Sequence, residues 1–208
     1  MAVEIDASRE GHLSRGIVLE YLTIGWNVIE GTVAVISGAV SGSIALVGFG
    51  VDSFIETSSG LILLWRLRAE RSGHDAERAE RIASRLVGVS FMLLAAYIGA
   101  DSLLKLLHQQ RPDQSLPGIV IAILSLIIMP WLAFQKRKTA SGLNSVALHA
   151  DSRQTSICAY LSVILLGGLL LNAFFDWWWA DPIAARAMVP IIVKEGQEAL
   201  RGKACKCH

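Results

Sequence analysis

The sequence predicts an all-α membrane protein, a bundle of six transmembrane helices with both termini in the cytoplasm. Of its 208 residues, 53% are hydrophobic and 18% are charged, with a net charge of +1 and a mean hydropathy of +0.48. A soluble domain of this size would carry more charge and fewer long apolar runs. Six apolar segments follow one another along the chain, and most basic residues lie in every second stretch between them.

Each apolar segment is close to the roughly 20 residues that a helix needs to cross the hydrocarbon core of a bilayer. The expected spans are 16–39, 43–64, 82–107, 116–134, 145–171 and 182–200. Pro130 should kink the fourth span or mark its last turn. The sixth span is the weakest of the set, because Arg186, Pro190, Lys194 and Glu195 interrupt it.

Polar stretches separate the spans. They are an N-terminal segment (1–15), a charged connector (66–81), a loop containing Pro and Gly (108–118), a basic connector (135–144) and a Cys/His tail (202–208). FFDWWW at 174–179 is an aromatic cluster of the kind found at membrane interfaces. The N-terminal segment, the two connectors and the chain from Arg201 onward hold thirteen Lys and Arg residues, against Lys105 and Arg111 elsewhere between spans. Because basic residues favour the cytoplasmic side, both termini are expected there.

Two carboxylates interrupt the second span. Asp52 and Glu56 are four residues apart, so on a helix they share one face, with Cβ atoms about 6 Å apart. A charged group near the bilayer centre costs at least about 2.5 kcal/mol, and two like charges also repel each other. A shared cation would offset both costs. The alternative is that both are interior residues, satisfied by Asn27, Ser53 or a backbone carbonyl.

The fifth span carries a second pair, Gln154 and Cys158, again four residues apart. At 1.5 Å per residue, Asp52 and Glu56 lie about 14 and 20 Å below the outer end of their span, and Cys158 and Gln154 about 18 and 24 Å below theirs. The two pairs therefore overlap in depth. Two carboxylates, an amide oxygen and a thiolate can form a four-coordinate site suited to Zn²⁺ or a similar divalent ion. The alternative for Cys158 is a small packing residue.

A polar stripe runs along the first span. Glu20, Asn27 and Glu30 follow at spacings of seven and three, so they either line an aqueous pathway and assist the site or make interhelical hydrogen bonds. Accessory metal roles are open for Asn27, Glu30, His74, Cys205, Cys207 and His208. The competing interpretations are a solvated loop residue at 74 and a disordered tail.

Several motifs together resemble one known family. SIALVGFGVDSFIE at 43–56 and ALHADSRQTSICAY at 147–160 are similar to the second and fifth helices of the cation diffusion facilitators, which are six-helix metal–proton antiporters. WADPI at 179–183 resembles the start of their sixth helix, and Gly73-His74, with Glu77 and Glu80 following, resembles their second connector. The resemblance covers about residues 14–201, nearly the whole chain.

By position, the resemblance implies a transport site at Asp52, Glu56, Gln154 and Cys158. Three of these depart from the family pattern: Glu replaces Asp at 56, Gln replaces His at 154 and Cys replaces Asp at 158. The amide weakens the case for Zn²⁺, whereas the thiolate strengthens the case for Zn²⁺, Cd²⁺ or another soft ion. Typical members add a cytoplasmic domain that senses metal and dimerises, so a short form without it is expected here, and a homodimer is left open.

The function expected from the sequence is export of a divalent metal ion, with Zn²⁺ the first candidate, in exchange for protons. The metal is the substrate, and we expect neither an enzyme activity nor a tightly bound cofactor. The near-zero net charge and the lack of a basic stripe argue against nucleic acid, and no GxxxxGK[ST] motif is present for ATP. Two alternatives stay open. One is an exporter of small organic cations, and the other is a non-transporting, metal-responsive membrane protein, which Arg186 and Pro190 favour.

Overall fold

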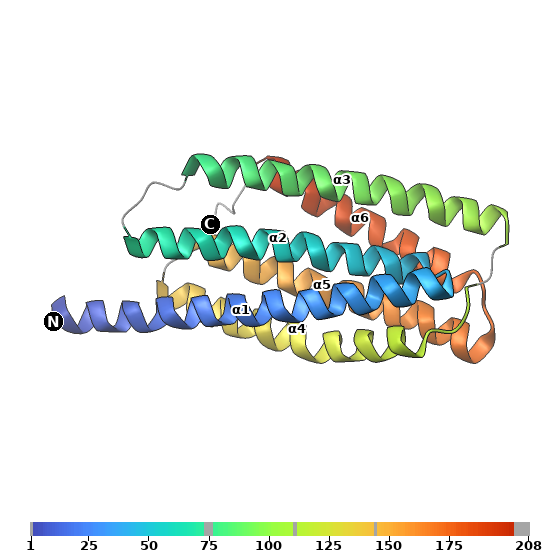
Figure 1. Ribbon diagram of the computed structural model, residues 1–208, viewed down its shortest axis with the longest axis horizontal. Helices are drawn as coiled ribbons and strands as arrows, with labels where there is room; N and C mark the ends of the chain where they lie inside the picture. The colour runs from blue at the N-terminus through green and yellow to red at the C-terminus, as the bar shows by residue number, and fades with distance from the viewer. Residues whose placement is uncertain (1, 73–76, 110–111, 144, 202–208) are drawn as a thin grey trace.

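The computed structural model describes residues 2–72, 77–109, 112–143 and 145–201, and nearly all of them are helical. The six helices are α1 (Ala2–Ser41), α2 (Ile44–Ser72), α3 (Glu77–Leu107), α4 (Leu116–Leu143), α5 (Val146–Phe175) and α6 (Ala180–Leu200). Figure 1 shows them running side by side as one elongated bundle. The all-α membrane bundle expected from the sequence is confirmed.

Helix α2 is central to the bundle, because it packs against α1, α3, α5 and α6. In Figure 1, α3 and α6 lie on one side of α2, and α1 and α4 lie on the other. The main apolar core joins Phe49 of α2, Ile98 of α3, Met129 of α4, Leu165 of α5 and Met188 of α6, all fully buried. The central position of α2 turns its two carboxylates toward the interior rather than toward lipid.

The helices extend beyond the apolar segments that predict them. Helix α1 begins at Ala2, α2 continues to Ser72, α3 begins at Glu77 and α4 continues to Leu143. The expected connectors 66–81 and 135–144 are therefore wrong in extent, since most of their residues are helical, and Pro130 does not mark the last turn of α4. The reason is that Arg, Lys, Glu and Gln are good helix formers, so a polar boundary need not end a helix.

Five of the six helices contain a stretch long and apolar enough to cross a membrane. These stretches are Gly11–Ser41, Ile44–Trp65, Gly88–Leu107, Leu116–Leu143 and Asp151–Phe175. Helix α6 is not among them, so its membrane crossing stays a prediction. It packs against α3 and α5 through buried residues such as Met188 and Ile192, while Arg186 and Pro190 lie on its exposed face.

Helices α1 and α2 approach each other closely at two glycines. A Cβ atom built on Gly50 would lie 2.8 Å from the backbone nitrogen of Val35 and 2.9 Å from the carbonyl oxygen of Gly31. A Cβ atom on Gly31 would in turn lie 3.0 Å from the carbonyl oxygen of Gly50. Small residues permit this backbone-to-backbone packing, which is common between membrane helices. The contact sets the spacing of the two helices just before Asp52.

The first turn of α2 is capped by a carboxylate from another helix. Asp181, at the start of α6, is fully buried and accepts hydrogen bonds from the Ser43 hydroxyl and from the backbone N–H of Ile44, the latter at 3.0 Å. The Ser43 oxygen itself accepts from the backbone N–H of Leu46 at 3.1 Å. Helix N-termini leave backbone donors unsatisfied, and a negative group there is stabilising. Asp181 therefore fixes α6 against the beginning of α2.

Candidate metal site

The interior of the bundle contains a column of buried polar side chains from three helices. Its members are less than a tenth exposed, and on α1 and α5 they recur every three or four residues, the spacing of one helix face. They are Glu20, Thr23, Asn27 and Glu30 of α1, Asp52, Ser53 and Glu56 of α2, and Asp151, Thr155, Cys158 and Ser162 of α5. The stripe expected on the first span is thus one wall of a shared polar interior.

The three helices meet at the carboxylate of Glu30. One of its oxygens, Oε2, accepts a hydrogen bond from the Ser53 hydroxyl at 3.0 Å and lies 3.9 Å from the Sγ donor of Cys158. Cys158 is 1% exposed, so its thiol faces the interior and not lipid. Glu30, expected only in an accessory role, therefore places a carboxylate oxygen beside the Cys158 thiol.

Asp52 and Glu56 lie in the same interior, with 6% and 2% of their surfaces exposed. Both carboxylate oxygens of Glu56 are buried without a hydrogen-bond partner among the described residues, as are both polar atoms of the Asn27 side chain. The Ser53 hydroxyl is used by Glu30. Neither Asn27 nor Ser53 therefore satisfies Glu56. Buried polar groups are nearly always paired, so these orphaned atoms indicate a proton, water or ion that enters the site.

Gln154 lies about one turn before Cys158 on α5, nearer the start of the helix. Its Oε1 accepts a hydrogen bond from the Ser59 hydroxyl of α2 at 3.2 Å, and its buried Nε2 has no partner in the described part of the chain. Ser59 is three residues past Glu56, so the amide sits almost one turn from that carboxylate. In the arrangement seen, the described residues contain no group of three or more His, Cys, Asp or Glu side chains placed to hold a metal ion. Coordination would require the side chains of Asp52, Glu56 and their neighbours to move closer together.

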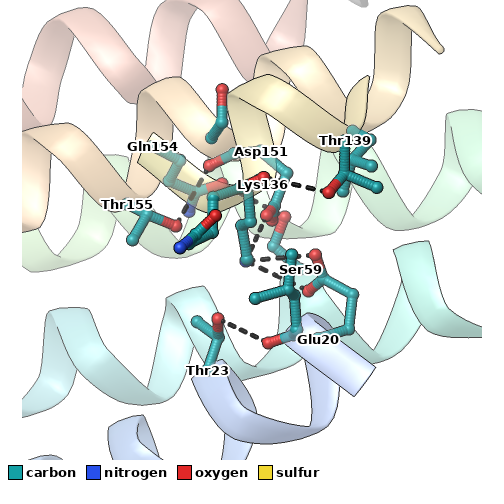
Figure 2. Close-up of polar contacts among 12 residues, drawn as sticks. Glu20, Thr23, Ser59, Lys136, Thr139, Asp151, Gln154 and Thr155 are labelled. Carbon is teal, nitrogen blue, oxygen red and sulfur yellow. Dashed lines mark hydrogen bonds and ion pairs between the residues drawn. The ribbon is translucent and has the colours of Figure 1, made fainter. Parts of the chain in front are cut away.

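A second polar cluster, the Glu20–Lys136–Asp151 triad, lies further along the same interior. Lys136 Nζ of α4 is 3.1 Å from Glu20 Oε1 and 3.2 Å from Glu20 Oε2, and it donates a hydrogen bond to Asp151 Oδ2. Figure 2 shows the ammonium group between the two carboxylates, with Gln154 and Ser59 nearby. Sequence reasoning placed Lys136 in a connector and gave Asp151 no role.

The remaining accessory candidates, His74, Cys205, Cys207 and His208, lie outside the described residues.

Comparison with known proteins identifies the family. A family model, the cation efflux transmembrane domain, matches residues 21–202, from the middle of α1 to just beyond α6. The chain belongs to the cation efflux family. The expected family membership is therefore confirmed.

Curated relatives of this cation efflux protein are distant in sequence. An uncharacterized transporter from Synechocystis is 27% identical over 169 residues, which cover 78% of this chain and 54% of that protein. An uncharacterized transporter from Methanocaldococcus jannaschii is 25% identical over 83% of this chain and 63% of its own length. A cadmium, cobalt and zinc/H(+)-K(+) antiporter from Bacillus velezensis is 26% identical, with coverages of 89% and 60%. The chain spans less than two thirds of the length of each.

Proposed function

We propose that this member of the cation efflux family exports a divalent metal ion from the cytoplasm, with protons as the counter-substrate. The observation that carries the proposal is the buried group of Glu30, Asp52, Glu56 and Cys158 inside a membrane bundle, with both oxygens of Glu56 unpartnered. Ionisable residues in that position are expensive and are normally retained for ion or proton pathways. The family match and the antiporter among the relatives support the same interpretation.

The ligands we assign are Asp52, Glu56 and Cys158, with Gln154 contributing its amide oxygen. Binding requires deprotonated carboxylates and a thiolate, so protons leave the site as the ion arrives. Protonation of Asp52 and Glu56 from the outside would then release the ion. Metal binding should therefore weaken as pH falls, since protons compete for the same oxygens.

A soft or borderline ion fits this donor set best. Thiolate selects Zn²⁺ or Cd²⁺, whereas Mn²⁺ and Mg²⁺ prefer oxygen ligands alone. The Bacillus velezensis relative carries cadmium, cobalt and zinc in its name, which supports an ion of this class for the present chain.

We also propose that both termini are cytoplasmic, as the distribution of basic residues predicts. Moving Lys136 from a connector to the interior leaves that imbalance intact.

Neither alternative gains support from the geometry. An exporter of organic cations would use Glu56 as a counter-ion but would leave the Cys158 thiol without a purpose. Arg186 and Pro190, which favoured a non-transporting protein, lie on the exposed face of α6 and do not enter the polar interior.

Proteoliposomes containing only the purified protein test the proposal. Zn²⁺ or Cd²⁺ added to one side should enter the vesicles and drive protons in the opposite direction, while Mg²⁺ and an organic cation such as tetraethylammonium should produce neither flux. Flux of the organic cation with no metal flux would favour the first alternative, and the absence of any flux would favour the second.

A further inference from the structure

The Glu20–Lys136–Asp151 triad is more than a structural salt bridge between helices. Glu20 and Lys136 are fully buried, and Asp151 is 6% exposed, so three charged groups from α1, α4 and α5 share one enclosed space. The desolvation of a buried ion pair offsets most of the Coulombic attraction between its charges. Well-packed apolar residues usually stabilise a fold as well or better. Stability alone therefore gives a weak reason for such a cluster in the bundle.

The triad holds more carboxyl oxygens than its single ammonium satisfies. Two carboxylates face one ammonium, and Asp151 Oδ1 is buried without a hydrogen-bond partner in the described part of the chain. The nearest hydroxyls do not serve the carboxylates, because Thr155 donates to the backbone oxygen of Asp151 and Thr139 to that of Gln135. A divalent cation could bind both carboxylates at once and use the Asp151 oxygen that the ammonium leaves unpartnered.

The triad also lies beside the candidate metal site. Asp151 precedes Gln154 by three residues and Cys158 by seven, which correspond to about 4.5 and 10 Å along α5. On α2, Gly60 follows Glu56 by one turn, and a Cβ atom on Gly60 would lie 3.4 Å from Glu20 Oε2. The triad lies nearer than the metal site to the end of the bundle where α5 begins. The basic residues predict that this end is cytoplasmic. An ion entering from there meets the triad before it reaches Glu56.

We propose that Glu20 and Asp151 form a second subsite for the divalent cation, on the cytoplasmic side of the metal site, and that the Lys136 ammonium fills this subsite when no metal is in it. The proposal deepens the proposed function and, as a step of transport, rests on it. An arriving ion displaces the ammonium, binds both carboxylates and then moves on to Glu56 and to Cys158, which lies about two turns beyond Asp151 on α5. Lysine suits this role because it is a compact charge on a flexible stem that can withdraw.

Metal binding tests the subsite apart from transport. In a background carrying Asp52→Asn and Glu56→Gln, Lys136→Met should add about one Zn²⁺ per chain in equilibrium dialysis, because it empties the subsite. Adding Glu20→Gln should remove that ion again. Lys138→Met, an exposed lysine on the same helix, is the matched control and should add none. A monodisperse Lys136→Met protein with no added ion overturns the proposal, whether or not the wild-type protein transports.

Transport kinetics decide the case even if Lys136→Met proves unstable. Glu20→Gln and Asp151→Asn, made singly with Lys136 retained, should each raise KM for Zn²⁺ by about tenfold, the equivalent of one lost charged ligand. Maximal flux per folded protein should change much less. If the triad only holds α1, α4 and α5 together, both variants would lower the yield of folded protein and leave KM unchanged, which contradicts the subsite. Absence of flux in the wild type would instead refute the proposed function.

Discussion

Replacing Gly50 by alanine should force α1 and α2 apart beside the metal site. The added Cβ atom would lie 2.8 Å from the backbone nitrogen of Val35, whereas ordinary contact begins at 3.4 Å, so the helices must separate by 3.4 − 2.8 = 0.6 Å. Rotation of a side chain cannot relieve the contact, because two of the close atoms, the nitrogen of Val35 and the oxygen of Gly31 at 2.9 Å, belong to the backbone. The strain therefore falls on the packing of the two helices.

The size of the effect follows from a comparison with Gly25, a glycine on α1. Overpacking typically costs about 1–3 kcal/mol. Alanine in place of glycine also stabilises a helix by about 1 kcal/mol, which partly hides that cost. Gly25→Ala gives the same helix gain without the clash, since nothing lies within 4 Å of a Cβ atom there. Gly50→Ala should therefore be less stable than Gly25→Ala by about 1–3 kcal/mol.

Thermal unfolding of the two detergent-purified variants measures this difference. In a chain of this length, 1 kcal/mol moves the midpoint by about 2–4 °C. Gly50→Ala should melt several degrees below Gly25→Ala and should also show reduced metal flux, because Asp52 is displaced with α2. Equal midpoints for the two variants would refute the close approach of α1 and α2.

Three further predictions concern Asp181, Cys158 and the C-terminal tail. Asp181→Ala removes the acceptor for the Ser43 hydroxyl and the Ile44 N–H and should lower the free energy of unfolding by about 2–4 kcal/mol. Asp181→Asn should lower it less. Equal and negligible losses of stability in thermal unfolding would show that α2 does not need this cap. Cys158→Asp should keep transport but shift preference from Cd²⁺ toward Zn²⁺ or Mn²⁺, and Cys158→Ser should lower affinity for every ion. If Cys158→Ser behaves like wild type and Cys158→Asp is inactive, Cys158 is a packing residue. Deleting residues 204–208 should at most lower apparent metal affinity modestly, and complete loss of flux would place the tail in the transport path.

The fold was largely predictable because membrane-crossing helices need long apolar segments, which stand out in a sequence. Helix ends were not predictable by the same signal. Residues such as Arg71 and Lys138 leave the apolar stretch but remain helical, since charged side chains with long stems favour helix. The end of a helix depends on solvation and capping, and hydropathy does not report either.

The site was predictable in part. Asp52, Glu56 and Cys158 interrupt apolar runs at helical spacing, and the structure places all three in the interior. Lys136 was missed because it stands in a basic run that reads as a connector. Its place on the buried face of α4 could nonetheless have been inferred, because position 136 continues the helical spacing of Met129, Leu132 and Thr139. The pairing of Lys136 with two carboxylates on other helices depends on tertiary contacts that no local pattern contains.

The most direct test of the metal site compares Zn²⁺ flux through wild type, Asp52→Asn and Glu56→Gln in proteoliposomes at equal amounts of folded protein. Each variant replaces one buried ionisable carboxyl group by an amide with little change in side-chain volume, so folding should survive while metal binding does not. Asp101→Asn, which removes a partly exposed carboxylate paired with Lys105, is the matched control and should transport normally. Loss of flux in both interior variants with normal flux in the control is the expected result. Full flux in either interior variant would contradict the assignment of Asp52 and Glu56 as metal ligands.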